Sequence, residues 1–427
     1  MSAAANFSAT VQRFIAGQRP FGPDLAAIRA QRVQGLVRHV SRHVALYRDL
    51  YRAQEVNIDD ILTPADLWRL PAVSKIHYLE AGQKGYTDGR GDLLNLYTQT
   101  TSGSLGRALT MYATPTEALQ LLANLWTGWL GMGVHVRDRL LMMSAPYLSE
   151  EVDPFRSLFV PVQMKIEETI ALFKRFRPTV IIGMVEAIAL LAVELQRRNL
   201  PERHEVRAIF PFGQTYSEQL RGMITTGFTA EVFVLYGSAE AGWLGYECEQ
   251  HDGLHVPEGR IDVQVARAGK PDEAAAPGEL GEVIVTSLLR GTTPFVRYRL
   301  HDAAALNLNR CPCGRAAPRI VQIEGRVQDF LVASEGHWVG PSGIAIDLMV
   351  GRPAIIDYRI VQTDREHVLV SLVVQPNLPA LETREVTEVV HRHLGSVQVE
   401  IELVKDIPRD PSGKRRRVFR MFDLPPA

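Results

Sequence analysis

Hydrophobic residues follow two different spacings along this chain. In the first 70 residues, positions such as Val33, Val37 and Val40 recur at helical spacing, which predicts amphipathic helices. From about residue 95, short apolar runs alternate with longer amphipathic stretches such as 185–198. Strands that alternate with helices are typical of a largely parallel sheet. The strands that we expect in this sheet are Arg139–Met143, Thr179–Gly183, Arg207–Phe210 and Glu231–Leu235.

The pattern changes to strands and turns after about residue 255. A turn rich in proline, glycine and alanine at 271–281 precedes the apolar strand Glu282–Ser287, which indicates a β-rich subdomain. The alternating strand His367–Val374 and the amphipathic helix Thr383–Leu394 then predict a compact α+β unit. We therefore expect an α/β protein. Its parts are a large N-terminal domain at 1–325 with a mostly parallel sheet, a hinge at 326–331 and a small, mobile α+β C-terminal domain at 332–427.

The composition of the chain argues against nucleic acid and membranes as binding partners. The 427 residues are 46% hydrophobic, and 47 basic side chains against 48 acidic ones give a net charge of −1. Bulk charge therefore does not favour binding to nucleic acid or to an anionic membrane surface, and no stretch of about 20 apolar residues predicts a membrane span. Three cysteines are too few for a disulfide scaffold and suit a reducing compartment. We expect a cytoplasmic protein without a nucleic-acid or membrane partner.

The segment 100–107 is a candidate for phosphate binding. Its glycines let the backbone approach an anion closely, and its hydroxyl and N–H groups can donate to phosphate oxygens. A cation in the same loop adds a charge-assisted contact. The pattern lacks the Lys-Ser/Thr pair of a Walker loop, so a plain polar turn is the alternative. The candidate residues are Thr101, Ser102, Gly103, Ser104, Gly106 and Arg107.

Two carboxylates lie close to aromatic residues in strand-like contexts. After the strand that ends near residue 235, Tyr236 can stack on an aromatic ring, and Glu240 can hold a Mg²⁺ ion that bridges phosphates. Asp302 follows an aromatic and basic run and suits the two hydroxyls of a ribose. The alternatives are a strand-end turn with a solvated glutamate and a surface strand of ion pairs.

Two further segments combine glycine with charged residues. The stretch 325–329 lies at the expected domain boundary, where glycine and polar residues form either a hinge or an ordinary linker. The loop 407–417 displays Lys414 among prolines, a serine and a glycine. A lysine on a mobile loop is a suitable charge for a developing phosphate anion. A basic tail that binds nucleic acid is the alternative.

All three cysteines lie in one region of the sequence. Cys248 is followed by His251 and His255, and Cys311-Pro-Cys313-Gly is a tight turn that can present two thiolates to one metal. Three thiolates and one imidazole would complete a closed tetrahedral zinc site with a structural role. The spacing is shorter than the usual Cys-x₂-Cys, so three unrelated thiols are the alternative.

Taken in order, these motifs resemble those of the adenylate-forming superfamily of acyl-CoA synthetases, most closely its phenylacetate–CoA ligase-like branch. The resemblance runs from Leu70 to the C-terminus. Its most specific parts are Tyr-Gly-Ser-Ala-Glu at 236–240, the stretch Thr-Ser-Leu-Leu…Pro-Phe-Val-Arg-Tyr-Arg at 286–299, Cys-Pro-Cys-Gly-Arg at 311–315 and Gly-Lys at 413–414. The resemblance implies ATP and coenzyme A as substrates, Mg²⁺ as a cofactor and a structural Zn²⁺ ion.

The resemblance also implies a role for each motif. The loop Ser102–Arg107 would grip the β- and γ-phosphates of ATP and release pyrophosphate. Asp302 would bind the ribose hydroxyls with Arg326 nearby, and Asp329 would be the pivot of the C-terminal domain. The catalytic residues would be Lys414, which bridges the carboxylate and the α-phosphate, and Glu240, which holds Mg²⁺. The other implied positions are Tyr236, Gly237 and Ser238 beside the adenine, Tyr147, Gly213 and Ala239 in the acid pocket, and Cys248, His255, Cys311 and Cys313 around zinc, with His255 preferred over His251.

The implied activity is activation of a carboxylic acid, an aromatic one in this branch, to an acyl-adenylate that reacts with the thiol of coenzyme A. Two departures from the family pattern motivate an amine or a carrier protein as the alternative acceptor. The segment after Tyr147 lacks the usual Gly-Gly turn, and Ala345 stands where a glutamate is common. A non-catalytic zinc-bearing binding protein is a third hypothesis. Lys75 receives no chemical role from the sequence, and a homodimer is the default oligomeric state.

Overall fold

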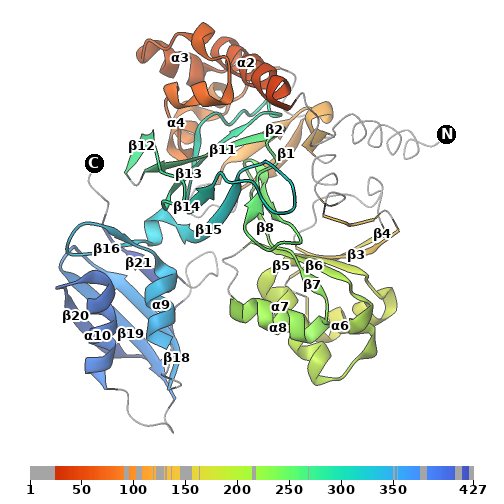
Figure 1. Cartoon of the computed structure of the whole chain (residues 1–427), viewed down its shortest axis with the longest axis vertical. Helices are drawn as coiled ribbons and strands as arrows, with labels where there is room; N and C mark the ends of the chain where they lie inside the picture. The colour runs from red at the N-terminus through yellow and green to blue at the C-terminus, as the bar shows by residue number, and fades with distance from the viewer. Residues whose placement is uncertain are drawn as a thin grey trace.

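A computed structural model of the chain describes residues 25–90, 96–101, 108–118, 120–121, 129, 132–135, 137–144, 156–162, 164–213, 218–267, 269–349, 352, 354–375, 382–408 and 416–422 (Figure 1). The described residues form a group of N-terminal helices, a parallel sheet, a large antiparallel sheet and a C-terminal α+β unit. This arrangement confirms the α/β fold class that the sequence predicts.

The N-terminal helices cover one face of the antiparallel sheet (Figure 1). They form because apolar residues recur three and four positions apart, as at Val33, Leu36, Val37 and Val40, all of which are buried. Buried residues of these helices and of the sheet belong to one core. The elements are α2 (Leu25–His43), α3 (Ala45–Ala53), η1 (Ile58–Asp60), η2 (Pro64–Arg69) and α4 (Lys75–Tyr86).

The parallel sheet has five strands in the order β4-β3-β5-β6-β7. Strands β3, β5 and β6 are buried along most of their length, as expected of strands with both faces covered. Helices α6, α7 and α8 gather along one side of this sheet in Figure 1. The elements are β3 (Arg139–Met143), β4 (Arg156–Val160), α6 (Ile166–Phe176), β5 (Val180–Met184), α7 (Val185–Arg197), η5 (Pro201–Glu205), β6 (Ala208–Phe212), α8 (Glu218–Phe228) and β7 (Glu231–Val232).

The expected strand Glu231–Leu235 is divided between two sheets. Its first part, β7, pairs parallel with β6. Its last residue begins β8 (Leu235–Ser238), which pairs antiparallel with β9 (Gly242–Glu247). The prediction of one continuous strand in the parallel sheet is therefore wrong at this point. Gly242 has a φ of +75°, which permits the tight turn that folds β8 back into the second sheet.

The antiparallel sheet has eight strands in the order β12-β11-β13-β14-β15-β10-β9-β8 and corresponds to the predicted β-rich subdomain. A short antiparallel hairpin, β1 with β2, flanks the segment 101–109. The remaining elements of this region are β1 (Tyr97–Thr100), β2 (Thr110–Ala113), β10 (Leu254–His255), β11 (Ile261–Arg267), β12 (Lys270–Ala274), β13 (Gly281–Ser287), β14 (Tyr298–Asn307), β15 (Arg319–Arg326) and η6 (Val327–Asp329).

The C-terminal unit is a four-stranded sheet in the order β20-β19-β18-β21 with two helices against it (Figure 1). Buried residues of α9, α10 and this sheet form one core. The predicted limits of the strand His367–Val374 and of the helix Thr383–Leu394 are confirmed. No helix in the described ranges is long and apolar enough to cross a bilayer. The elements are β16 (Leu331–Val332), β17 (Trp338–Val339), α9 (Pro341–Met349), β18 (Ile355–Gln362), β19 (His367–Val374), α10 (Thr383–Leu394), β20 (Gln398–Leu403) and β21 (Val418–Arg420).

Candidate active site

Tyr236 and Asp302 meet in the structure although 66 residues separate them. The Tyr236 hydroxyl donates a hydrogen bond of 2.7 Å to Asp302 Oδ2, and Arg326 Nε lies 2.9 Å from Asp302 Oδ1. Arg326 is the register partner of Asp302 between β14 and β15. Because both oxygens have partners, the carboxylate is held in one orientation. Burial raises the pKa of Asp302, whereas Arg326 and the Tyr236 hydrogen bond oppose that rise.

Glu240 lies in the turn between β8 and β9. The turn is held by Ser238, whose Oγ accepts a hydrogen bond of 3.1 Å from the Ala241 N–H. The Tyr298 hydroxyl donates to Glu240 Oε1 at 3.3 Å. Within the described part of the chain, Glu240 Oε2 accepts no hydrogen bond, so this oxygen is available to a cation. An anionic oxygen donor of this kind suits Mg²⁺.

Lys75 belongs to the same region, although the sequence analysis gave it no role. Val73 pairs with the start of β14: its N–H donates to the Arg297 carbonyl at 2.9 Å, and its carbonyl accepts from the Arg299 N–H at 2.8 Å. This pairing places Lys75 so that its Nζ donates to Thr101 Oγ1 at 3.2 Å. Thr101 in turn closes the base of the predicted phosphate loop, because its backbone N–H bonds to the Leu109 carbonyl at 3.0 Å.

The position of Lys75 is unfavourable for an isolated cation. Lys75 is only 6% exposed and is the first residue of α4, at the positive end of the helix dipole. Burial lowers its pKa, and Glu240 opposes this effect. Among the described residues, no carboxylate forms a salt bridge with Lys75. A bound anion would therefore stabilise it in place.

Several residues of the predicted site cannot be placed. The loop residues Ser102, Gly103, Ser104, Gly106 and Arg107 lie outside the described residues, as do Tyr147 and Lys414. Of the predicted nucleotide site, the structure thus brings together Tyr236, Asp302 and Arg326, and it places Glu240 and Thr101 next to Tyr298 and Lys75, respectively.

Small residues adjoin two aromatic rings in the region predicted to hold the acid. A Cβ on Gly213, where φ is +95°, would lie 2.5 Å from the sulfur of a neighbouring methionine. A Cβ on Gly237 would lie 2.7 Å from a backbone oxygen. Phe212 and Trp243, which neighbour these glycines in sequence and in register, pack edge to face with centroids 5.3 Å apart. Ala239 is half-buried against the core of the antiparallel sheet.

The three cysteines and one histidine converge on one point. The ligand atoms of Cys248, His255, Cys311 and Cys313 all lie within 4.8 Å of one another. Cys248 Sγ is 3.9 Å from Cys311 Sγ, and Cys313 Sγ is 3.4 Å from His255 Nε2. A tetrahedral zinc ion with Zn–S bonds of about 2.3 Å separates its sulfur ligands by about 3.8 Å. The donor set and its spacing therefore fit zinc.

The fold explains why His255, and not His251, belongs to this cluster. His255 ends β10, which pairs with both β9 and β15, so it lies between Cys248 and the turn that carries the other two cysteines. Burial lowers the pKa of His255 to about 4, which leaves the imidazole neutral at pH 7. His251 instead lies 3.3 Å from Glu247 Oε2 and stacks on Phe233.

The predicted hinge is joined to the end of the chain. Asp329, in η6, accepts hydrogen bonds of 2.9 and 2.5 Å from Arg416. Arg420 donates to the carbonyls of Val327 and Phe330 at 2.8 and 2.7 Å. Burial raises the pKa of Asp329, and Arg416 opposes the rise. The residues on either side of the predicted pivot are thereby held against β21.

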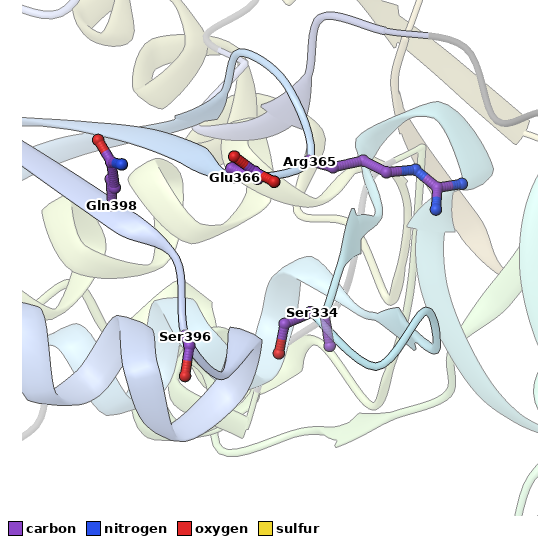
Figure 2. Close-up of a pocket in the computed structure, with 6 residues that line it drawn as sticks. Ser334, Arg365, Glu366, Ser396 and Gln398 are labelled. Atoms are coloured by element: carbon purple, nitrogen blue, oxygen red, sulfur yellow. The ribbon is translucent and has the colours of Figure 1, made fainter.

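A polar hollow of about 300 Å³ lies in the C-terminal unit (Figure 2). Figure 2 shows Arg365 and Glu366 in the turn after β18, with Ser334, Ser396 and Gln398 around them. None of the residues that line it belongs to the site predicted from the sequence, and its two charged side chains are of opposite sign. The hollow is therefore separate from the Tyr236–Asp302 region. The lining residues are Ala333, Ser334, Arg365, Glu366, Ser396 and Gln398.

Comparison with known sequences gives matches over most of the chain. Residues 331–421 match the family model described as the CapK C-terminal domain. Over 411 residues the chain is 22% identical to Protein CapK of Staphylococcus aureus, an alignment that covers 92% of this chain and 88% of that protein. Over 368 residues it is 25% identical to a phenylacetate-coenzyme A ligase of Thermus thermophilus, which covers 79% of this chain and 78% of the ligase.

Solved structures share the fold. A 2-hydroxyisobutyryl-CoA ligase, in the postadenylation state in complex with R3-HIB-AMP, superposes with a TM-score of 0.72 at 20% identity. The superposition covers 92% of this chain and 88% of that one. The amide bond synthetase McbA of Marinactinospora thermotolerans superposes with a TM-score of 0.56 at 16% identity, over 76% of this chain and 69% of that one.

Proposed function

Because the chain belongs to the adenylate-forming superfamily, in its phenylacetate–coenzyme A ligase-like branch, we propose that it joins an aromatic carboxylic acid to the thiol of coenzyme A by way of an acyl-adenylate. The observation that carries this proposal is the oriented carboxylate of Asp302, held between Tyr236 and Arg326. A fixed carboxylate beside an aromatic ring suits the ribose and base of a nucleotide. Glu240 and Lys75 lie in the same region, where the phosphates would extend.

In the first step, an oxygen of the acid attacks the α-phosphorus of ATP, the bond from that phosphorus to the bridging oxygen of the β-phosphate breaks, and pyrophosphate leaves. Asp302 holds the ribose, and Tyr236 lies beside the adenine. Glu240 would hold Mg²⁺, which when bound would supply positive charge to the phosphates. Lys75 with Thr101 adds a cation and a hydroxyl at the base of the phosphate loop. Such a site works by positioning the reactants and by compensating charge.

In the second step, the sulfur of coenzyme A attacks the carbonyl carbon of the acyl-adenylate. The bond between that carbon and the phosphate oxygen breaks, AMP leaves, and the thiol proton passes to solvent. Lys414 serves the first step, and a rotation of the C-terminal domain about Asp329 exposes the adenylate to the thiol. The hydrogen bond of Arg416 to Asp329 and that of Arg420 to the Val327 carbonyl support a pivot at this position.

An amine acceptor is the second candidate. The fold likeness to an amide bond synthetase supports it, as does the absence of the usual glutamate at Ala345. In that reaction the nitrogen of an amine replaces sulfur as the nucleophile, and the adenylation step is unchanged. The third hypothesis, a zinc-bearing binding protein without catalysis, is supported only by the metal cluster and the basic run at 414–417.

We also propose that Cys248, His255, Cys311 and Cys313 hold a structural zinc ion. Four protein ligands leave no open position for a substrate or a water molecule. The ion would join β9, β10 and the β14–β15 turn, which lie at the same end of the antiparallel sheet as β8. Its role is therefore to support the strands that carry Tyr236.

The deciding experiment is ATP–pyrophosphate exchange with a panel of aryl, arylacetic and aliphatic acids in the absence of coenzyme A. Exchange that depends on one class of acid is the expected result. Product analysis with coenzyme A, with amines and with an acyl carrier protein then identifies the acceptor. Failure of every acid, together with no binding of ATP by calorimetry, would overturn the proposal in favour of the third hypothesis.

A further inference from the structure

Arg290 lies in a turn that is joined to strand β2 and to Glu117, which follow the predicted phosphate loop in the sequence. The turn follows β13, and two of its backbone N–H groups, those of Gly291 and Thr292, donate to Glu117 Oε1 at 2.8 and 2.9 Å. In addition, the Tyr112 N–H in β2 donates to the hydroxyl of Thr293 at 2.9 Å. Strand β2 comes directly after the segment 101–109, so the turn is attached to the element that follows the loop.

The side chain of Arg290 is buried, and its Nε atom has no acceptor. Arg290 is 6% exposed, and its Nε has neither solvent contact nor a hydrogen-bond partner. Its guanidinium carbon lies 5.9 Å from the centroid of the Phe295 ring. In the described ranges, no carboxylate forms a salt bridge with it. Glu117 and Glu240 lie near enough to oppose the effect of burial on its pKa, but Glu117 accepts from Gly291 and Thr292, and Glu240 accepts from Tyr298. Burial lowers the pKa of Arg290 to about 10, so it remains charged at neutral pH.

A buried arginine whose N–H donors have no acceptor destabilises the fold unless a ligand accepts their hydrogen bonds. Leaving N–H groups unpaired in a desolvated site carries a free-energy penalty that a surface arginine does not have. The planar guanidinium group presents its donors in a fork that matches two oxygens of a phosphate. The missing partner is therefore an oxyanion.

Arg290 is connected to Glu240 through two aromatic rings. Phe295, on which the guanidinium group rests, packs edge to face with Tyr298 at a centroid distance of 5.0 Å. The hydroxyl of Tyr298 then donates to Glu240. Glu240 also opposes the effect of burial on the pKa of Arg290, so Arg290 and the proposed Mg²⁺ ligand lie within electrostatic reach of each other.

We propose that Arg290 binds the β- and γ-phosphates of ATP and the pyrophosphate that they become. This inference rests on the proposed function, because it takes ATP as the ligand. Lys75 stands at the base of the same loop, so pyrophosphate would lie between two buried cations. AMP, which lacks these phosphates, would not touch Arg290.

The test compares binding of Mg·ATP, pyrophosphate and AMP by calorimetry in the wild type, Arg290→Met and Arg290→Lys. We expect Arg290→Met to weaken Mg·ATP and pyrophosphate by about tenfold to a hundredfold, which is the range for charged hydrogen bonds, and to leave AMP within twofold. Arg290→Lys keeps the charge but not the fork, and its loss is expected to be intermediate. Arg29→Met is the matched control, since Arg29 lies in α2 and pairs with Glu258 and with Asp262 of β11.

A purely structural arginine would behave differently. Arg290→Met would then lower the melting temperature as Arg29→Met does, and would either leave all three affinities unchanged or weaken AMP in parallel; both results overturn the inference. If Arg290→Met does not fold, Arg290→Lys decides by the same selectivity between pyrophosphate and AMP. The titrations need no acid and no turnover. If the wild type binds ATP but none of the acids supports pyrophosphate exchange, the proposed ligase function is contradicted. The titrations would still show whether Arg290 binds the phosphates.

Discussion

Replacing Tyr236 by Phe removes a single hydroxyl group and tests the orientation of Asp302. The ring keeps its packing, and the hydroxyl donates only to Asp302 Oδ2 among the contacts of the described residues, at 2.7 Å. The Asp302 side chain is 13% exposed, so solvent cannot readily replace the lost donor. Arg326 still holds the other oxygen. The substitution thus frees one half of the carboxylate without removing its charge.

The size of the effect follows from the kind of hydrogen bond that is lost. A hydrogen bond to a charged group contributes about 1.5–3 kcal/mol to stability. For a chain of this size we expect a fall in Tm of roughly 2–3 °C. Because Arg326 retains part of the orientation, the KM for ATP in pyrophosphate exchange should rise by about tenfold, the low end of the same range.

The pH dependence gives an independent test with a definite sign. The Tyr236 hydrogen bond lowers the pKa of Asp302, so its loss raises that pKa and shifts the acid limb of kcat/KM for ATP to higher pH. Burial raises the pKa of Asp302 in the folded protein above its value in the unfolded chain. The contribution of this carboxyl group to stability is therefore complete below the unfolded pKa and is lost as the pH rises through the folded pKa. Tyr236→Phe raises the folded pKa of Asp302 further above the unfolded one. The loss of stability relative to the wild type is therefore largest at neutral pH, where Asp302 is ionised, and becomes smaller in acid.

A matched control separates this role from simple packing. Tyr78→Phe removes another buried hydroxyl, which donates to the Pro294 carbonyl at 2.7 Å, a neutral acceptor. Tyr78→Phe should lose stability with no change in the KM for ATP. An acid limb of Tyr236→Phe that stays in place or moves to lower pH, with an unchanged KM, would refute the reasoning about Asp302.

Three other predictions follow from the site. Lys75→Met should lower kcat/KM for ATP by about tenfold in pyrophosphate exchange while AMP binding is retained, and equal weakening of AMP would contradict a phosphate role. Lys414→Ala should abolish adenylation but spare thioester formation from a supplied acyl-adenylate, whereas equal loss of both steps would exclude its assignment to the first. Elemental analysis should find one zinc per chain, lost in Cys313→Ala, and the cobalt-substituted protein should show thiolate-to-metal absorption; a stable chain free of metal would disprove the zinc site.

The elements that the sequence predicted well are those with a single dominant periodicity. Strand β19 buries Val368, Val370 and Leu372 at every second position, and helix α10 has one apolar face, so their limits are confirmed residue by residue. The prediction of one strand at 231–235 was wrong because the apolar run before Tyr236 continues from β7 of the parallel sheet into β8 of the antiparallel sheet. Which sheet a buried strand joins depends on its partner, and β9, with its two glycines, has no strong strand pattern of its own.

The motif residues were recognisable one by one, but their contacts were not. Asp302 and Arg326 face each other because of the register of β14 and β15, and Tyr236 reaches Asp302 from a strand that is not a neighbour of β14 in the sheet. The zinc cluster was more accessible to sequence reasoning because its residue types are themselves specific. Choosing His255 over His251 on geometry nevertheless requires knowing that β10 pairs with β9 and β15.

Lys75 and Arg290 explain why part of the site escapes sequence analysis altogether. A lysine at a helix start and an arginine in a turn are ordinary in sequence, and what distinguishes these two is burial without an ion-pair partner in the described part of the chain. That property follows from tertiary pairing, of Val73 with β14 and of the β13–Phe295 turn with β2. The same property makes the free protein less stable than it would be with its ligand. Mg·ATP at a hundred times its Kd should therefore stabilise the chain by about 2.7 kcal/mol, and a substitution at either cation should reduce that gain at fixed ligand concentration.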